Sequence, residues 1–157
     1  MNEIARAAGC SRATLYRYFE NRDALYAAYV HRETHRVFGA LGARIAQVTD
    51  PRQRLIEGVV AALGSVRESP ALASWFASRQ RPIGGELAER SEVIKVLTET
   101  FLGSLGVQAV EQRARWLIRV MISLLVFPGH DDQDERAMLE EFVLPTVMPM
   151  TQSQPSS

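Results

Sequence analysis

The stretch of sequence that decides the fold runs from Asn2 to Leu25 and reads NEIARAAGCSRATLYRYFENRDAL. It predicts a short helix, a tight turn and a second short helix. Gly9 has the backbone freedom to end the first helix, and Ser11 follows it as an N-cap for the second. Apolar residues recur at helical spacing on both helices. They are Ile4, Ala5 and Ala8 on the first helix and Leu15 and Phe19 on the second.

Two helices joined by a short turn that contains Gly form a helix-turn-helix, whose second helix can enter a DNA major groove. The stretch resembles the TetR family of bacterial repressors, whose pattern is roughly Ile-Ala-x-x-Ala-Gly-Val-Ser-x-x-Thr-Leu-Tyr-x-Tyr-Phe-x-x-Lys-x-x-Leu. Cys10 stands where the family usually has Val, and Arg22 where it usually has Lys. The matching residues are Ile4, Ala5, Ala8, Gly9, Ser11, Thr14, Leu15, Tyr16, Tyr18, Phe19 and Leu25.

The resemblance implies an all-α protein with a helix-turn-helix head followed by a helical body for ligand binding and dimerisation. We assign the head to residues 1–37, the body to 38–147 and a disordered tail to 148–157. Family members carry another helix before the motif, whereas Met1 falls almost on its first residue here. We therefore expect an incomplete head, as a misassigned start codon or a truncation would leave.

Composition sets the broad class of the protein. The chain has 157 residues, of which 46% are hydrophobic, so it can build a packed core. The net charge is zero, and residues 1–36 hold six arginines against four acidic side chains, a small local excess suited to few phosphate contacts. The single cysteine excludes an internal disulfide. The apolar run from Leu124 to Phe127, like every other apolar run in the chain, is far shorter than the ~20 residues of a membrane span, so we expect a cytoplasmic protein without membrane contact.

The rest of the chain predicts helices and shows no alternating strand pattern. Gly39 and Gly42 lie inside the first long helix, where they mark either a hinge or a close packing contact. Residues 81–85 predict a loop. The expected helices run from about Asn21 to Val48, Pro51 to Glu68, a short one around Trp75, Glu86 to Leu105, Gln108 to Phe127, and Asp132 or Asp134 to about Val147.

The second short helix carries the candidate DNA contacts, because Leu15 and Phe19 point inward and leave the remaining side chains outward. Tyr and Arg reach phosphates, Thr and Ala can touch a thymine methyl, and Arg can bind guanine with two hydrogen bonds. By resemblance, Ser11, Tyr16 and Arg22 would hold phosphates. The residues that would lie near base edges are Arg12, Thr14, Arg17 and Tyr18. Ala13 is also on the outward side of this helix. The alternative is an ordinary amphipathic helix pair.

The resemblance also implies a small-molecule effector, of unknown identity, bound in an apolar pocket among the body helices. Two arginines are possible polar anchors for it. The candidate pocket residues are Trp75, Phe76, Arg79, Phe101, Trp116, Arg119 and Met121. Each aromatic residue could equally be part of an ordinary core.

A homodimer is expected because the helix before Phe127 is apolar over more than one face and needs cover beyond a single body. Pairing of the last two helices with their two-fold mates would bury these faces in a four-helix arrangement. The candidate interface residues are Leu117, Val120, Met121, Leu124, Leu125, Met138 and Phe142. We expect the five that lie on the helix before Phe127 to be exposed in one subunit.

No other chemistry is predicted. His31 and His35 have the spacing of two metal ligands, but no third ligand is placed, and the acidic run 130–135 fits helix capping better than a calcium loop. We expect no metal, no cofactor and no enzymatic activity, since no catalytic motif is present. The sequence predicts a TetR-like regulator, a repressor that binds a palindromic double-stranded DNA operator as a homodimer and leaves it with its ligand. The alternative is a dimeric ligand-binding or interaction module that cannot bind DNA because its head is truncated.

Overall fold

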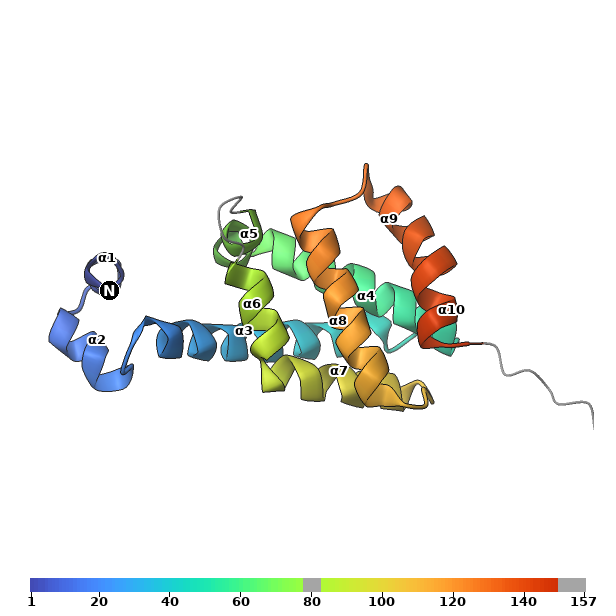
Figure 1. Ribbon diagram of the computed structural model, residues 1–157, viewed down its shortest axis with the longest axis horizontal. Helices are drawn as coiled ribbons and strands as arrows, with labels where there is room; N and C mark the ends of the chain where they lie inside the picture. The colour runs from blue at the N-terminus through green and yellow to red at the C-terminus, as the bar shows by residue number, and fades with distance from the viewer. Residues whose placement is uncertain (78–82, 150–157) are drawn as a thin grey trace, which may run out of the picture.

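The computed structural model describes residues 1–77 and 83–149, and within these ranges all regular structure is helical, which confirms the all-α prediction. The short helices α1 and α2 lie at one end of the molecule, beyond a body of packed helices, and the long helix α3 joins the two parts (Figure 1). The helices are α1 Asn2–Ala7, α2 Arg12–Tyr18, α3 Arg22–Ile45, α4 Pro51–Glu68, α5 Pro70–Ala77, α6 Ile83–Arg90, α7 Glu92–Ser104, α8 Val110–Val126, α9 Asp132–Met138, η1 Leu139–Val143 and α10 Leu144–Val147.

α3 is one continuous helix that belongs to both parts of the molecule. It begins at Arg22, where the side chain of Asn21 accepts the Ala24 N–H at 2.8 Å, and it ends at Ile45, three residues before the predicted end. Gly39 and Gly42 do not interrupt it, and a Cβ at either position would meet no atom within 4 Å. Close packing therefore does not explain these glycines.

The main core lies where α4, α7, α8 and the C-terminal helix meet. Its most deeply buried side chains expose 0–1% of their surface, and removing such a leucine costs roughly 2–5 kcal/mol in a typical core. The leucines among them are Leu55, Leu63, Leu102, Leu117 and Leu139. The predicted last helix begins at Asp132 and comprises α9, the π-helical turn η1 and α10, which follow one another along one side of the body (Figure 1). Pro145 lies in the first turn of α10, a position where a helix tolerates a residue without an N–H.

The region between α5 and α8 departs from the predicted loop and single helix. Residues 83–85 begin α6 instead of forming a loop, while Arg81 and Pro82 fall outside the described residues. The predicted helix from Glu86 to Leu105 is two helices, because Ser91 adopts an extended backbone and its side chain accepts the Ile94 N–H at 3.3 Å, which starts α7.

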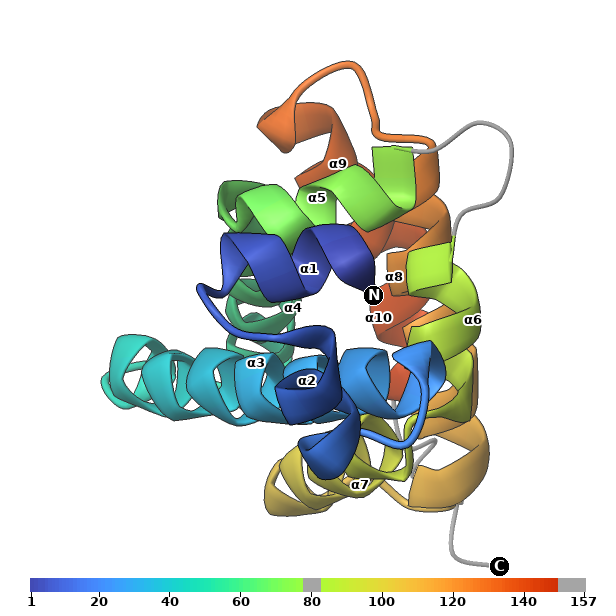
Figure 2. The ribbon, with the colours of Figure 1, turned by 90° about the vertical axis from the view of Figure 1, so that its left-hand side faces the viewer.

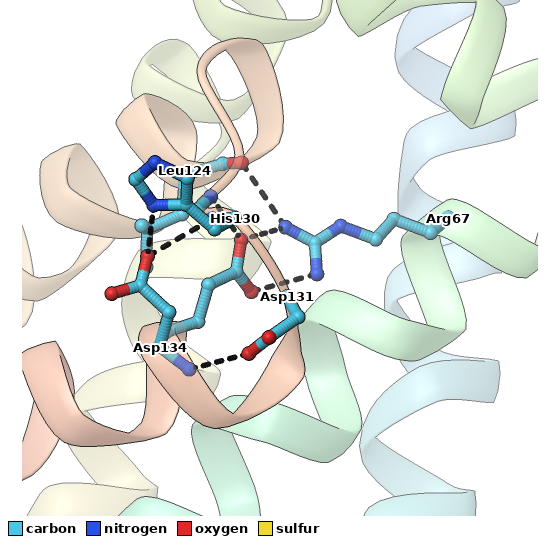
Figure 3. A network of polar contacts seen from close by, with 7 residues as sticks. Arg67, Leu124, His130, Asp131 and Asp134 are labelled. Carbon is cyan, nitrogen blue, oxygen red and sulfur yellow. Dashed lines mark hydrogen bonds and ion pairs between the residues drawn. The ribbon is translucent and has the colours of Figure 1, made fainter.

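A polar network fastens α4 to α8, to α9 and to the segment that joins these two helices (Figure 3). The Arg67 guanidinium donates to both carboxylate oxygens of Glu135, at 2.6 and 2.8 Å, and to the Leu124 carbonyl at 3.1 Å. The Gly129 N–H donates to the same carboxylate at 2.9 Å. The Arg67 hydrogen bond lowers the pKa of Glu135, although burial of this carboxyl opposes the shift. Glu135 is therefore held as a carboxylate inside the fold.

The acidic run beside this network caps a helix, as predicted. The Asp131 side chain accepts the Asp134 N–H at 2.8 Å, and Asp134 accepts the His130 N–H at 2.9 Å, which lowers the pKa of Asp134. His31 and His35 contact each other edge to face with ring centroids 4.8 Å apart. In residues 1–77 and 83–149, no three His, Cys, Asp or Glu side chains gather as a metal site would require. None of the helices described here has the length and apolar character needed to cross a membrane.

Candidate functional site

The turn between α1 and α2 is fixed by backbone hydrogen bonds that require Gly9. This residue has φ of 64°, in the left-handed region that favours glycine. The Gly9 N–H donates to the Arg6 carbonyl at 3.1 Å, and the Cys10 N–H donates to the Ala5 carbonyl at 3.0 Å. These two bonds form a Schellman motif, which ends α1 and sets the direction of the chain that enters α2.

Ser11 then starts α2, as the sequence predicts. Its side-chain oxygen accepts the Thr14 N–H at 3.0 Å, and the two hydroxyl oxygens lie 2.8 Å apart. The capping bond satisfies one of the N–H groups that a helix leaves free at its N-terminus. The start of α2 is therefore held in place by its own sequence.

The two sides of α2 differ in burial. Leu15 exposes only 7% of its surface, and Phe19, just after the helix, is half-buried, so both face inward. Tyr16 exposes 39% and Tyr18 exposes 70%, whereas Thr14 is half-buried. The other predicted DNA-contact residues are all exposed, namely Ser11, Arg12, Ala13, Arg17 and Arg22. Seen from the head end, α1 and α2 lie in front of the body (Figure 2).

Both arginines of α2 stack on tyrosine rings. Their guanidinium carbons lie 5.2 Å from the ring centre for Arg12 over Tyr16 and 5.3 Å for Arg17 over Tyr18. Neither Arg12 nor Arg17 has an acidic partner among the described residues. Stacking on a ring orients a guanidinium without neutralising it. The outer face of α2 thus presents oriented positive charges together with hydroxyl groups, which are groups that bind phosphates and base edges.

The third stacked arginine, Arg22, lies at the start of α3. Its guanidinium carbon is 5.1 Å from the centre of the Tyr26 ring, and its Nε donates a hydrogen bond to the Tyr26 hydroxyl. The Tyr26 ring in turn contacts Trp75 of α5, with ring centroids 5.0 Å apart. Tyr29 contacts the same indole at 5.3 Å. Aromatic contacts therefore connect the head end of α3 to the body.

A cavity of about 130 Å³ lies in the body, lined by residues of α3 to α8. Four of the predicted pocket residues line it, which are Trp75, Phe76, Phe101 and Met121. Arg79 lies outside the described residues. Trp116 and Arg119 do not line the cavity, because both lie on the outward side of α8; Trp116 exposes 37% of its surface and Arg119 pairs with Glu89 at 2.8 Å.

Helix α3 supplies cavity residues that the sequence analysis did not single out. Glu33 and Thr34 expose only 8% each and line the cavity beside Val30 and Val37. The apolar residues at positions 30, 37, 38 and 41 mark this face by their helical spacing, and Thr34 occupies the same stripe. The helix that carries the head therefore also forms one wall of the cavity.

Some of the residues predicted to form the dimer interface are buried in the core of one chain, and others are exposed. The expected exposure of Leu117 and Leu124 is wrong, because they expose 1% and 8% and belong to the core. Four others are half-buried against that core, which are Val120, Met121, Leu125 and Met138. Phe142 exposes 60%. Two exposed apolar residues were not predicted for the interface, Trp116 of α8 at 37% and Phe127 just after that helix at 76%. Trp116 and Val120 lie one turn apart on one face of α8.

Comparisons with known proteins agree with this geometry. The model of the family described as bacterial regulatory proteins, tetR family, matches residues 1–29. Two relatives, each named an uncharacterized HTH-type transcriptional regulator, come from Mycobacterium tuberculosis strains CDC 1551 / Oshkosh and ATCC 25618 / H37Rv. Each is 57% identical over 152 residues, which is 95% of this chain and 75% of the relative. No solved structure matches the chain at a significant level.

Proposed function

The chain belongs to the TetR family of bacterial regulatory proteins, and from this we propose that it is a homodimeric repressor that a small molecule releases from a palindromic operator. Its general role follows from the family and the relatives: it is a transcriptional regulator of the helix-turn-helix type and not an enzyme. The observation that carries the proposal is the two-sided burial of α2, with Leu15 inside and Arg12, Arg17 and Tyr18 outside.

We assign the DNA contacts by the chemistry of each exposed side chain. Ser11, Tyr16 and Arg22 flank the outer face of α2 and would bind phosphates. The residues that would lie near base edges are Arg12, Ala13, Thr14, Arg17 and Tyr18. The proposed boundary between head and body at residues 37 and 38 falls inside α3, so the two parts share this helix.

The proposed dimer interface lies on the outward side of α8 and of the C-terminal helix. Trp116, Phe127 and Phe142 expose large apolar side chains there. Burying such side chains against a second copy gains roughly 25 cal/mol per Å² of apolar surface removed from water. A two-fold axis at this surface would place two heads on half-sites about one DNA turn, ~34 Å, or a multiple apart.

The effector site would be the cavity in the body. Its residues come from five body helices and from α3, which also carries the head. A ligand that fits better when α3 is displaced would shift the protein towards the form that does not fit the operator. Release from DNA requires such a difference in affinity between the two forms.

The test begins with selection of bound sequences from a pool of random duplexes, followed by footprinting. The expected result is a palindromic site protected on both halves, bound by a species of twice the 17.5 kDa chain mass in sedimentation. A dimer that enriches no sequence would refute the operator model and support the alternative, a dimeric ligand-binding module without DNA binding. A chain that sediments as a monomer at micromolar concentration would refute both.

A further inference from the structure

The cavity has a size and a lining that define the chemical class of its ligand. We propose that it binds a small, uncharged aromatic molecule of about one ring, a class represented by toluene. The inference rests on the proposed function in one respect, that this cavity is the effector site.

The volume limits the ligand to a single ring. The cavity measures about 130 Å³. A cavity of about 150 Å³ with an apolar lining accommodates benzene, whereas pockets for drug-sized ligands measure about 300–1,000 Å³. A molecule with two or more fused rings therefore exceeds the space that this structure offers.

The lining contains no free charge to pair with an ionised ligand. Glu33 is the only ionisable side chain among the described residues that line the cavity. Its carboxylate already accepts from Arg36 at 2.8 Å and pairs with Arg32 at 3.3 Å. An anion would therefore meet no cation here, and a cation would have to compete with two guanidinium groups. Burying a charge without a partner is strongly unfavourable, so the ligand is uncharged.

The polar lining groups of α7 are also satisfied within the protein. The Thr98 hydroxyl donates to the Ile94 carbonyl at 2.7 Å, one turn earlier in the same helix. Among the other described residues that line the cavity, the polar side-chain groups are the Thr34 hydroxyl and the Trp75 indole N–H. All remaining described lining residues have apolar side chains or are glycines. Such a surface favours a ligand that needs few or no hydrogen bonds.

The aromatic walls favour a flat ring over a branched aliphatic molecule. Trp75, Phe76 and Phe101 line the cavity. The last two rings lie directly on glycines, since a Cβ at Gly84 would stand 2.9 Å from the Phe76 ring and a Cβ at Gly58 would stand 2.7 Å from the Phe101 ring. These glycines let the rings approach the helix backbones of α6 and α4. Aromatic pairs in offset or edge-to-face contact add attraction beyond the area that they bury.

The test uses the emission of Trp75, which lines the cavity, in a Trp116→Phe background that removes the other tryptophan. The full chain is titrated at pH 7 with toluene, benzoate and benzylammonium, which share one ring and differ in charge. We expect saturable binding of toluene with an affinity at least tenfold higher than that of either ion. Equal or tighter binding of an ion, or no saturable signal up to the solubility of toluene, would overturn the proposal.

Two cavity variants separate binding in the cavity from binding elsewhere. Ala88→Phe fills the space and should lower toluene affinity at least tenfold, whereas Ala43→Phe, on the exposed side of α3, should change it less than twofold. Met121→Ala enlarges the cavity and should raise the affinity for naphthalene at least tenfold, a gain that a misfolded variant cannot show. If Ala88→Phe binds toluene as the parent does, or Met121→Ala gains no affinity for naphthalene, the assignment is wrong.

Operator binding, measured on the unmodified chain without ligand, tests the proposed repressor separately from the proposed ligand class. Toluene binding by a chain that binds no operator would support the ligand class and contradict the proposed repressor. Operator binding by a chain that ignores toluene but takes up benzoate would contradict the ligand class and leave the repressor standing.

Discussion

The Trp75 indole and the Tyr26 ring are in contact, with centroids 5.0 Å apart and an angle of 52° between their planes. Trp75 lines the cavity, and the Tyr26 hydroxyl accepts a hydrogen bond from Arg22, a proposed phosphate contact. Direct contacts therefore run from Trp75 in the cavity wall to Arg22 in the DNA-binding head through one intervening side chain, that of Tyr26. This arrangement supplies a physical route that could couple the cavity to the DNA-binding residues, and the strength of that coupling is measurable.

Removing the Tyr26 hydroxyl should weaken DNA binding without affecting the cavity. Tyr26→Phe keeps the ring against Trp75 but leaves Arg22 without its hydrogen bond, which is typically worth about 0.5–1.5 kcal/mol. We expect a loss of operator affinity of that order in fluorescence anisotropy and unchanged toluene affinity. Tyr29→Phe is the matched control, because Tyr29 contacts the same indole but lies one turn further from the head. Equal losses in both variants would contradict the route through Arg22.

Arg17→Ala should lower operator affinity by about 1–3 kcal/mol and relax the preference for one base pair, if Arg17 reads a base edge. Arg17 is exposed and stacked on Tyr18, so its loss leaves the fold intact. Arg44→Ala, an exposed arginine at the other end of α3, removes the same charge far from the head and should have little effect. A loss of equal size on operator and random DNA would identify Arg17 as a phosphate contact instead.

Phe142→Glu should convert the dimer to monomers. Phe142 exposes 60% of its surface in one chain, so a charge there costs nothing in the monomer but would be buried in the proposed interface. Analytical ultracentrifugation checks the expected shift to the 17.5 kDa species. Gln112→Glu, exposed near the start of α8, is the control with the same new charge and should leave the dimer intact.

Leu124→Glu should give a different outcome from Phe142→Glu. Leu124 exposes only 8% and packs in the core of one chain, so the charge would destabilise the fold itself. Circular dichroism should show lost helicity or a lower melting temperature for Leu124→Glu and an essentially native spectrum for Phe142→Glu. A folded, monomeric Leu124→Glu protein would show that this side chain belongs to the interface after all.

Glu135→Gln should lower the free energy of unfolding by roughly 2–3 kcal/mol, because it leaves the Arg67 guanidinium without its charged partner. The same pair predicts a pH dependence. Glu135 has a pKa below its ordinary value of 4.5 in the folded protein, so it binds fewer protons there than in the unfolded chain. Its contribution to stability is complete above that ordinary value and is lost as the pH falls through the folded pKa. Urea titrations of both proteins from neutral to acidic pH should converge; a constant difference would contradict the assignment.

Local signals in the sequence were sufficient for the head. Gly9 and Ser11 act on the backbone within a few residues, so the turn and the start of α2 follow directly from their chemistry. Ser91 acts in the same local way, but it lies inside a long apolar pattern that predicts one helix instead of two. At Ser91 a single capping residue favours a new helix, whereas the apolar periodicity favours one continuous helix. The sequence alone does not show which of these two signals decides the structure.

The faces of α8 could not be assigned from sequence for a different reason. The second half of the helix is apolar almost all round, so its periodicity does not say which side meets the core, the cavity or solvent. Leu117 and Leu124 are internal, whereas Trp116 is external. Only the packing of α4 and α7 against α8 separates these roles, and those contacts join segments distant in the chain. For the same reason Trp116 and Arg119 were placed in the cavity by sequence and lie outside it in the structure.

Because α3 is one continuous helix, a small rotation at one of its ends produces a larger displacement at the other end. Its far end is anchored where Leu41 and Ile45 pack with Ala61, and its 24 residues extend about 36 Å from that anchorage to the head. A tilt of about 5° at the anchored end would carry α2 by roughly 3 Å, the length of one hydrogen bond. If the proposed effector displaced α3 at the cavity wall, nearer the pivot, by a fraction of that distance, the head would move out of register with a DNA groove while every helix kept its internal structure.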